Sequence, residues 1–455
     1  MAQNITLMGA SYSGVPGVNL PKTGGGQAYF VDSSDANAVA SDIATGKTAY
    51  VNGTKVTGTN SGGGGGGTSK KQINFIDYDG TILYAYTKAE INAMTSESDL
   101  PANPSHTGLT AQGWNWTLAQ IKAQLTAVPN GDVWVGQMYI TQSGNTEIDV
   151  SMPYGRLSPT LTICVNGEIT VDWGDNTTPD TVTGTSLTTR KAVPHTYASE
   201  GDYTISIHVV SGKYAFYNSS SYLILRKGTT ANSSRVYANC IQIIRLGSGI
   251  TSIGNYAFQY CSSLASITIP NTVTSISDYA FQYCYSLASI TIPNTVTSIG
   301  KSAFYYCYSL ANITIPNTVT SIGGSAFNTC SSLASVTIPN TVTSIGTYAF
   351  SNCSSLASVT ISHTVTSISD YEFQNCYSLA SITIPDTVTS IGNNAFSSCY
   401  GMAEYHILPT TPPTLGSSVF GSIQSDCKIY VSSASLSTYQ TASNWSTYAS
   451  YMVGE

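Results

Sequence analysis

Apolar side chains in the C-terminal half of the chain recur with one fixed period. From about residue 241 the same apolar types return every 23 residues, most clearly at Cys261, Cys284, Cys307, Cys330, Cys353, Cys376 and Cys399. Four further columns keep this spacing and begin at Ile250, Ile253, Phe258 and Leu264. Such a period is typical of solenoids, in which each repeat is one coil and stacked coils bury a continuous core. The pattern therefore predicts a rod of stacked coils.

The N-terminal half has shorter and more varied patterns. Residues 136–212 alternate between apolar and polar with the two-residue period of strands. Before them, strand patterns meet at Asp79-Gly80, and short helices are expected at 88–94 and within GWNWTLAQIKAQL, whose Trp114 and Trp116 should fill a small core. The sequence thus predicts a mainly β, multidomain chain, with an N-terminal module at 1–60, a Gly-rich linker at 61–72, a small α+β module at 73–135, a β-sandwich at 136–228, a solenoid at 235–425 and a C-terminal cap at 426–455.

Charge and composition narrow the functional classes. Only 9% of the residues are charged and the formal net charge is −7, which argues against nucleic acid or an anionic membrane as a partner. No apolar run approaches the roughly 18 residues that span a membrane, and the first residues lack the features of a signal peptide. No G-x-S-x-G, H-E-x-x-H or P-loop motif occurs. We therefore expect a protein without catalytic residues, cofactor or membrane insertion.

The ten cysteines raise the question of disulfides or a metal site. Seven of them share one column beside the Phe column, and side chains stacked in a ladder point the same way, which is poor disulfide geometry. The sequence has no C-x-x-C pair and no Cys/His cluster that would suit zinc. We expect buried, reduced thiols that pack as small hydrophobic groups, and no metal site.

Two motifs in residues 136–228 carry a family resemblance. VDWGDN at 171–176 and HTYASEGDYTISIHV at 195–209 together resemble the PKD-like, immunoglobulin-type β-sandwich, which implies a spacer or adhesive role. Asp172, Asp175 and His195 are also compatible with a metal or acid–base site. We favour a structural interpretation, in which Asp175 closes a turn and His195 forms a corner with Tyr197.

The repeat carries a second resemblance. The unit LxxIxIPxxVTSIxxxAFxxCxxL, over about 241–407, closely resembles the BspA-type leucine-rich repeat, whose members are bacterial or phage-borne surface proteins associated with attachment. Residues 1–60, especially MGASYSGVPGVNLPKTGGG and DIATGKTAYVNGTKVTGT, resemble short N-terminal modules of phage structural proteins. That resemblance implies an anchor to capsid or tail proteins of a virion. The missing signal peptide fits, because lysis releases virions without export.

Five polar columns of the repeat change from coil to coil, whereas the Thr and Ser of TVTSI hardly change. These columns begin at Asn255, Tyr256, Gln259, Tyr260 and Ser262, and they flank the apolar Phe and Cys, so we expect them on one outer edge. Tyrosine gives large, rigid contacts at low entropic cost, as in antibody binding sites. Neutral drift is the alternative to functional diversification. The predicted ligand-binding residues are Tyr256, Tyr260, Tyr279, Tyr283, Tyr285, Tyr305, Tyr306, Tyr308, Tyr348, Tyr371, Tyr377 and Tyr400.

Together these patterns predict a phage fibre or decoration protein, anchored to the virion by its N-terminus. The solenoid would bind a protein, glycan or mucus on the host surface. The alternative is a BspA-like adhesin on a bacterial cell surface. The identity of the ligand, a capsid or tail location, and assembly into a homo-oligomer such as a trimer stay open.

Overall fold

The computed structural model describes residues 71–78, 80–127, 133–216, 224–227 and 237–455, together with the backbone of six short strands before residue 58. The chain forms two compact units, Met1–Thr68 and Ser69–Glu455. The described strands of the first unit pair as β1 (Ile5–Leu7) with β2 (Ala10–Tyr12), β3 (Gly17–Pro21) with β4 (Gln27–Val31), and β5 (Thr48–Val51) with β6 (Thr54–Thr57). Apart from Lys71 and Gln72, the predicted linker lies outside the described residues.

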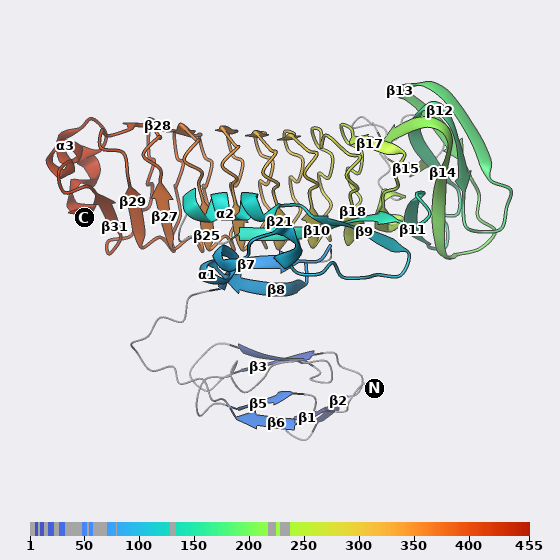
Figure 1. Cartoon of the computed structure of the whole chain (residues 1–455), viewed down its shortest axis with the longest axis horizontal. Coiled ribbons are helices and arrows are strands. Elements are labelled where there is room, and N and C mark those ends of the chain that lie inside the picture. Colours follow the sequence, from blue (N-terminus) through green and yellow to red (C-terminus); the bar gives the residue numbers. More distant parts are fainter. Residues whose placement is uncertain are drawn as a thin grey trace. The chain divides into compact units, whose positions relative to one another are not determined.

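The second unit begins with an α+β module, a four-stranded sheet with two helices on one face (Figure 1). Its elements are β7 (Lys71–Ile76), β8 (Ile82–Thr87), α1 (Lys88–Ala93), the 3-10 turn η3 (Glu97–Asp99), β9 (Leu109–Trp114), α2 (Leu118–Ala127) and β10 (Val133–Thr141), in the strand order β8-β7-β10-β9. Trp116 is buried and Trp114 packs edge-on against Phe75, which confirms their predicted core role. The boundary predicted at 135/136 falls inside β10.

An eight-stranded sheet links residues 146–216 to the solenoid. It contains β11 (Thr146–Met152), β12 (Pro159–Asp172), β13 (Asp180–Pro194), β14 (Gly201–Phe216), β15 (Leu225–Lys227), β16 (Ile241–Arg245), β17 (Ile250–Ile253) and β18 (Ser266–Thr268). The long strands β11 to β14 are antiparallel, and β16 pairs with β11 on one side and in parallel with β18 on the other. The sheet therefore runs directly into the first coils.

The solenoid coils are joined by two parallel ladders, as the 23-residue period predicts (Figure 1). One ladder continues from β18 through β19 (Ser289–Thr291), β21 (Asn312–Thr314), β23 (Ser335–Thr337), β25 (Ser358–Thr360), β27 (Ser381–Ile384), β29 (Glu404–Ile407), β31 (Lys428–Val431) and β32 (Met452–Gly454). The other follows β17 through β20 (Ser298–Ile299), β22 (Ser321–Ile322), β24 (Ser344–Ile345), β26 (Ser367–Ile368), β28 (Ser390–Ile391) and β30 (Thr414–Leu415). Paired residues differ by 23 in sequence, for example Ser289 with Asn312.

The apolar columns form the core of this rod. Rings of successive Phe residues, from Phe258 to Phe396, lie 5.2–5.6 Å apart. All ten cysteines are buried and none of them forms a disulfide, as predicted. In the repeat column, from Cys284 to Cys399, each Sγ donates to the carbonyl of a Phe in the preceding coil, as Cys284 does to Phe258 at 3.2 Å. One hydrophobic cluster extends from Ile148 to Met452, so the antiparallel strands and the solenoid share a core.

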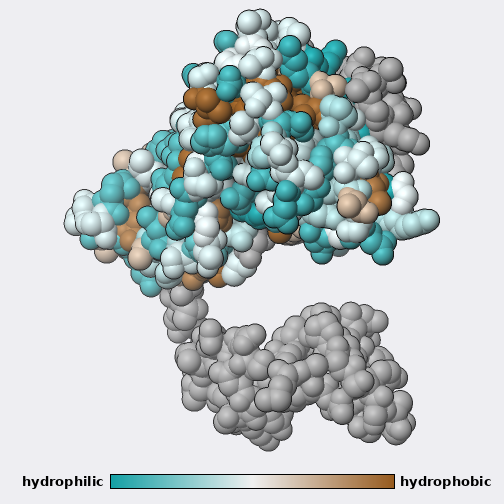
Figure 2. All heavy atoms as spheres, turned by 90° about the vertical axis from the view of Figure 1, so that its right-hand side faces the viewer, coloured by the Kyte–Doolittle hydropathy of each residue, from teal (hydrophilic) through white to brown (hydrophobic). Residues whose placement is uncertain are grey.

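Both ends of the solenoid are covered. At the C-terminal end, α3 (Leu436–Thr441) and the 3-10 helix η5 (Ser446–Tyr451) pack over the last coils, with the Trp445 indole donating to the Pro413 carbonyl. Figure 2 looks onto the opposite end, where the long antiparallel strands lie; hydrophilic and intermediate residues dominate there and hydrophobic ones form small patches. Scattered apolar surface of this kind is ordinary.

The α+β module docks on the sheet face of the first coils (Figure 1). Asn115 is fully buried, and its side-chain amide donates to the Ile292 carbonyl and to Thr314 Oγ1, at 3.2 and 2.9 Å. The Trp116 indole donates to the Ile315 carbonyl and the Gln124 amide to the Ile338 carbonyl. The covered threonines of the ladder, Thr268, Thr291, Thr314 and Thr337, are 0–5% exposed, whereas Thr383 is exposed. The module thus covers four coils and leaves the later ones open.

Candidate functional site

The predicted tyrosines lie on the turns that connect the two ladders. Two residues of each of these turns have a left-handed backbone, with φ between 51° and 64°, in the columns that begin at Tyr256 and Tyr260. This conformation costs a non-glycine residue about 1–2 kcal/mol. It persists because the backbone N–H of each such residue donates to a carbonyl of the next coil, as Tyr256 does to Asp278 at 3.0 Å. Sequence patterns carried no signal for this geometry, because both columns lack glycine.

The tyrosine rings stack on one another along the solenoid. Stacked pairs are Tyr256 with Tyr279, Tyr260 with Tyr283, Tyr283 with Tyr306, Tyr285 with Tyr308, Tyr348 with Tyr371, and Tyr377 with Tyr400, at centroid distances of 4.5–5.7 Å. Tyr305 meets Tyr306 edge-on. We call these twelve tyrosines the tyrosine edge. Each stacked pair covers one face of each of its two rings, so the edge offers ring rims, the uncovered ring faces and hydroxyl groups to a partner.

None of the twelve tyrosines is buried in the core. Tyr285, Tyr308, Tyr348, Tyr377 and Tyr400 are 37–53% exposed, and the other seven are half-buried. Partial burial, followed by the hydrogen bond with Tyr306 and the neighbouring phenols, raises the pKa of Tyr305 to about 12. The pKa of Tyr308 and of Tyr348 is also raised, chiefly by burial. These hydroxyls therefore remain protonated at neutral pH and can donate as well as accept hydrogen bonds.

One of the five variable columns departs from the expected outer position. In the column that begins at Gln259, the side chains of Gln259, Gln282 and Ser351 are buried, and the Gln259 amide donates to the Gln282 carbonyl group. This column lies beside the Phe column and faces partly inward. Variation in it reflects local packing as well as surface chemistry.

Another variable column has a structural task. Asp278 accepts a hydrogen bond from the backbone N–H of Lys301 at 2.7 Å, and Asp370 accepts one from Asn393 at 2.6 Å. Each carboxylate therefore holds the turn of the following coil. A comparison of repeats alone does not reveal this role, because the bonds join residues 23 positions apart.

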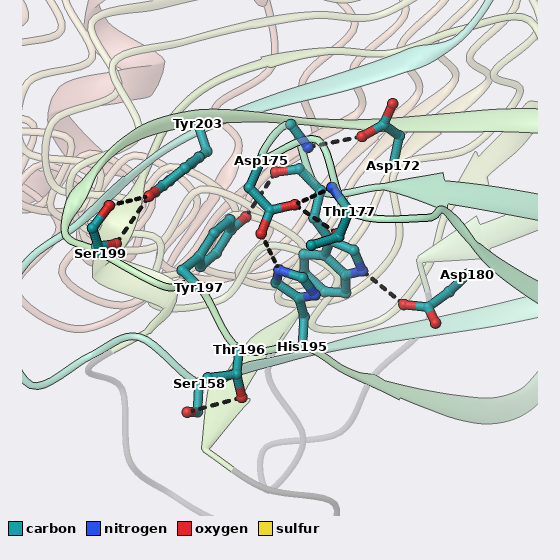
Figure 3. Close-up of polar contacts among 12 residues, drawn as sticks. Ser158, Asp172, Asp175, Thr177, Asp180, His195, Thr196, Tyr197, Ser199 and Tyr203 are labelled. Carbon is teal, nitrogen blue, oxygen red and sulfur yellow. Dashed lines mark hydrogen bonds and ion pairs between the residues drawn. The ribbon is translucent and has the colours of Figure 1, made fainter.

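The motif residues of the antiparallel strands form a structural corner (Figure 3). Asp175 accepts from the backbone and hydroxyl of Thr177 and contacts His195 Nε2 at 2.8 Å, and the His195 ring stacks on Trp173. The Tyr197 hydroxyl donates to the Trp173 carbonyl. Burial opposes ionisation of Asp175, but these hydrogen bonds outweigh it and lower its pKa. The predicted turn at Asp175 and the predicted corner of His195 with Tyr197 are both present.

The residues that the structure describes contain neither a metal-binding cluster nor a membrane-spanning helix. No group of three or more His, Cys, Asp or Glu there is arranged to hold a metal ion. Within the same ranges, no helix has the length and apolar character needed to cross a bilayer.

Stacked 23-residue coils with parallel ladders and a shared apolar core define a solenoid of the leucine-rich-repeat class. The family model for the BspA type leucine rich repeat region matches in six copies, over residues 209–334 and 320–443. The chain therefore belongs to the BspA-type leucine-rich-repeat family. No match is found among curated proteins.

Several solved structures are similar to this chain. The leucine rich repeat protein TpLRR of T. pallidum is 30% identical, with a TM-score of 0.31, over 39% of this chain and 79% of that one. A leucine rich cell surface protein of Faecalibacterium prausnitzii A2-165 is 29% identical, with a TM-score of 0.30, over 46% of this chain and 62% of that one, less than two thirds of its length. A leucine-rich repeat protein of Bacteroides ovatus ATCC 8483 is 26% identical, with a TM-score of 0.39, over 59% of this chain and 70% of that one. Each of these three proteins is described as leucine rich or as a leucine-rich repeat protein.

Proposed function

We propose that this chain is a non-catalytic adhesion protein that binds its target through the tyrosine edge. The observation that carries the proposal is the gathering of twelve tyrosines on one edge of a rigid rod, outside the core, among Ser, Asn and Thr. Because the rings already stack on one another, few rotamers are lost when a partner binds, which lowers the entropic cost of association. The target is a protein, glycan or mucus on a host surface.

Replacing the four exposed tyrosines of one column by serine tests this proposal. Tyr285, Tyr308, Tyr377 and Tyr400 belong to the column in which Ser262, Ser331 and Ser354 occur naturally, so serine is compatible with the turn. We expect the full-length variant to lose at least about tenfold in affinity, since aromatic residues dominate binding energy at interfaces. Binding to whole bacterial cells, immobilised mucin and a glycan array provides the measurement.

The matched control changes Thr297, Thr320, Thr343 and Thr389, which are exposed on the other ladder, to serine. This control should bind like the wild type. The tyrosine variant should remain folded, because each lost ring pair contributes only about 0.5–1.5 kcal/mol. Unchanged binding of a folded tyrosine variant would rule out the tyrosine edge as the binding surface.

We further propose that residues 1–60 anchor the chain to capsid or tail proteins of a phage virion. The support is the resemblance of this segment to phage structural modules, with the Gly-rich stretch Gly62–Gly67 as a flexible connection. Several copies on one particle would strengthen weak individual contacts through effective concentration. The family membership of the repeats supports the alternative, an adhesin on a bacterial cell surface.

The location of the protein in a producing culture distinguishes a virion protein from a bacterial surface adhesin. For a virion protein, antibodies against the solenoid should label purified particles in electron microscopy, and deletion of residues 1–60 should abolish this labelling while leaving the solenoid folded. Labelling of intact producing cells, with none on particles, would overturn the virion assignment and favour the bacterial adhesin.

A further inference from the structure

One column of the tyrosine edge is interrupted at its centre. In the column that begins at Ser262, the stacked pair Tyr285–Tyr308 is followed by Ser331 and Ser354, and then by the stacked pair Tyr377–Tyr400. We call this stretch of two coils the serine interval. Because the next position beyond Tyr308 and the position before Tyr377 are serines, one face of each ring is turned toward the interval. Tyr308 is 40% and Tyr377 46% exposed.

Both interval serines fold back onto the solenoid. The Ser331 hydroxyl donates to the carbonyl of Tyr308 at 3.5 Å, and the Ser354 hydroxyl donates to the carbonyl of Ser331 at 3.3 Å. Their side chains are half-buried, so they form a low floor between the two tyrosine pairs. The backbone continues unbroken below them, since Thr329 N–H donates to the Ser351 carbonyl at 2.8 Å.

The Phe column gives the width of the interval. In the same four coils Phe304, Phe327, Phe350 and Phe373 are separated by three steps of 5.3, 5.3 and 5.6 Å, about 16 Å in all. A group that touches both tyrosine faces at about 3.5–4 Å must therefore be about 8–9 Å thick. One sugar ring is too thin to contact both faces. An extended polypeptide fits, because its successive side chains point to opposite sides.

The lack of charged residues around the serine interval indicates which side chains the partner carries. Between Lys301 and His363 the sequence contains no Asp, Glu, Lys, Arg or His. The centre of the solenoid therefore offers no ion pairs, and burial of a charged partner group against it would not be compensated. Aromatic faces and small hydroxyl groups suit a segment with uncharged side chains.

We propose that the serine interval holds an extended, uncharged polypeptide segment of the target, with alternating side chains against Tyr308 and Tyr377. The proposal rests on the adhesive function of the tyrosine edge and specifies its ligand. The ligand would bind over the two coils that carry Ser331 and Ser354 in place of tyrosine.

Filling the interval provides the decisive variant. Ser331→Tyr with Ser354→Tyr would extend the tyrosine stack through the gap, and tyrosine is native at this position in four other coils. Peptides selected from a random dodecapeptide display library on the full-length protein serve as the probe. We expect them to lose at least about tenfold in affinity for the filled variant. Ser262→Tyr, which adds a tyrosine to the same column outside the interval, should leave affinity unchanged.

The outcomes separate this inference from the proposed function. Peptides that bind the filled variant as well as the wild type, or a library that yields no binders, would overturn the polypeptide assignment. Neutral oligosaccharides that bind in place of peptides, and are lost on filling, would also overturn it. If the filled variant still adheres to cells while the four-tyrosine variant does not, the tyrosine edge binds the target but the interval does not. Should the filled variant unfold, Tyr308→Ser and Tyr377→Ser replace it, and each should weaken peptide binding.

Discussion

Replacing Glu372 by alanine is expected to raise the free energy of unfolding, and to do so most strongly above pH 8. Glu372 is fully buried and stands where the other coils have Ala257, Ala280, Ala303, Ala326, Ala349 and Ala395. Its Oε2 accepts from the Ser369 backbone N–H at 2.7 Å, but its Oε1 is buried without a hydrogen-bond partner. Burial raises the pKa of Glu372 to about 8, and the Ser369 hydrogen bond opposes this only in part.

The sign of the pH effect follows from this raised pKa. The folded chain keeps the Glu372 proton up to about pH 8, whereas the unfolded chain loses it near pH 4.5. Between these values the folded state binds more protons, so the wild type loses stability as pH rises and the loss is complete above pH 8. A shift of this size corresponds to roughly 3–5 kcal/mol. Alanine at position 372 removes this contribution to the pH dependence.

Urea unfolding at pH 4.5 and pH 9 measures this effect. The difference between Glu372→Ala and wild type should grow with pH, and Glu372→Gln, which keeps the side-chain shape, should show the same trend. Glu200→Ala removes an exposed carboxylate and serves as the matched control, whose difference from wild type should be the same at both pH values. Parallel pH profiles for Glu372→Ala and wild type would show that the buried carboxyl ionises in the folded state at little cost.

Replacing Gly136 by valine is expected to detach the α+β module from the solenoid. A Cβ atom at this position would lie 2.5 and 2.7 Å from Oγ1 and Cγ2 of Thr291, and 2.7 Å from Oγ1 of Thr314. Overpacking of this kind costs about 1–3 kcal/mol in a core. Here the strain can be relieved by separation, because the interface is polar and some buried atoms in it, among them Thr291 Oγ1 and Gln124 Oε1, have no hydrogen-bond partner.

Hydrogen exchange locates the expected separation. In Gly136→Val, amides of the covered strands β19 and β21 should exchange faster, while those of β27 and β29, beyond the module, should not change. A double-mutant cycle gives the control: Thr291→Ala removes two of the three clashing atoms, so it should partly rescue Gly136→Val while having little effect alone. Equal exchange in wild type and Gly136→Val would mean that the interface adjusts without opening.

The sequence predicted the parts of the molecule that repeat. The apolar columns from Ile250 to Leu264 identify the solenoid because each coil buries the same positions against its neighbours, and the period makes them visible. The burial of the repeat thiols was predicted in the same way, because seven cysteines share one column beside the Phe column. The tyrosine edge was also predicted residue by residue, since positions beside the inward Phe and Cys must lie at the turn.

The remaining features depend on contacts between segments far apart in the chain. Asn115 reaches Ile292 and Gly136 touches Thr291 only because the module docks on the sheet face, and neither segment has a period that points to the other. Left-handed turns at Tyr256 and Tyr260, and the burial of Gln259, arise from hydrogen bonds between coils. Local pattern thus determined which side chains enter the core and which stay outside. Tertiary structure alone decided which outer surfaces remain accessible, because burial by a distant segment leaves no trace in local sequence.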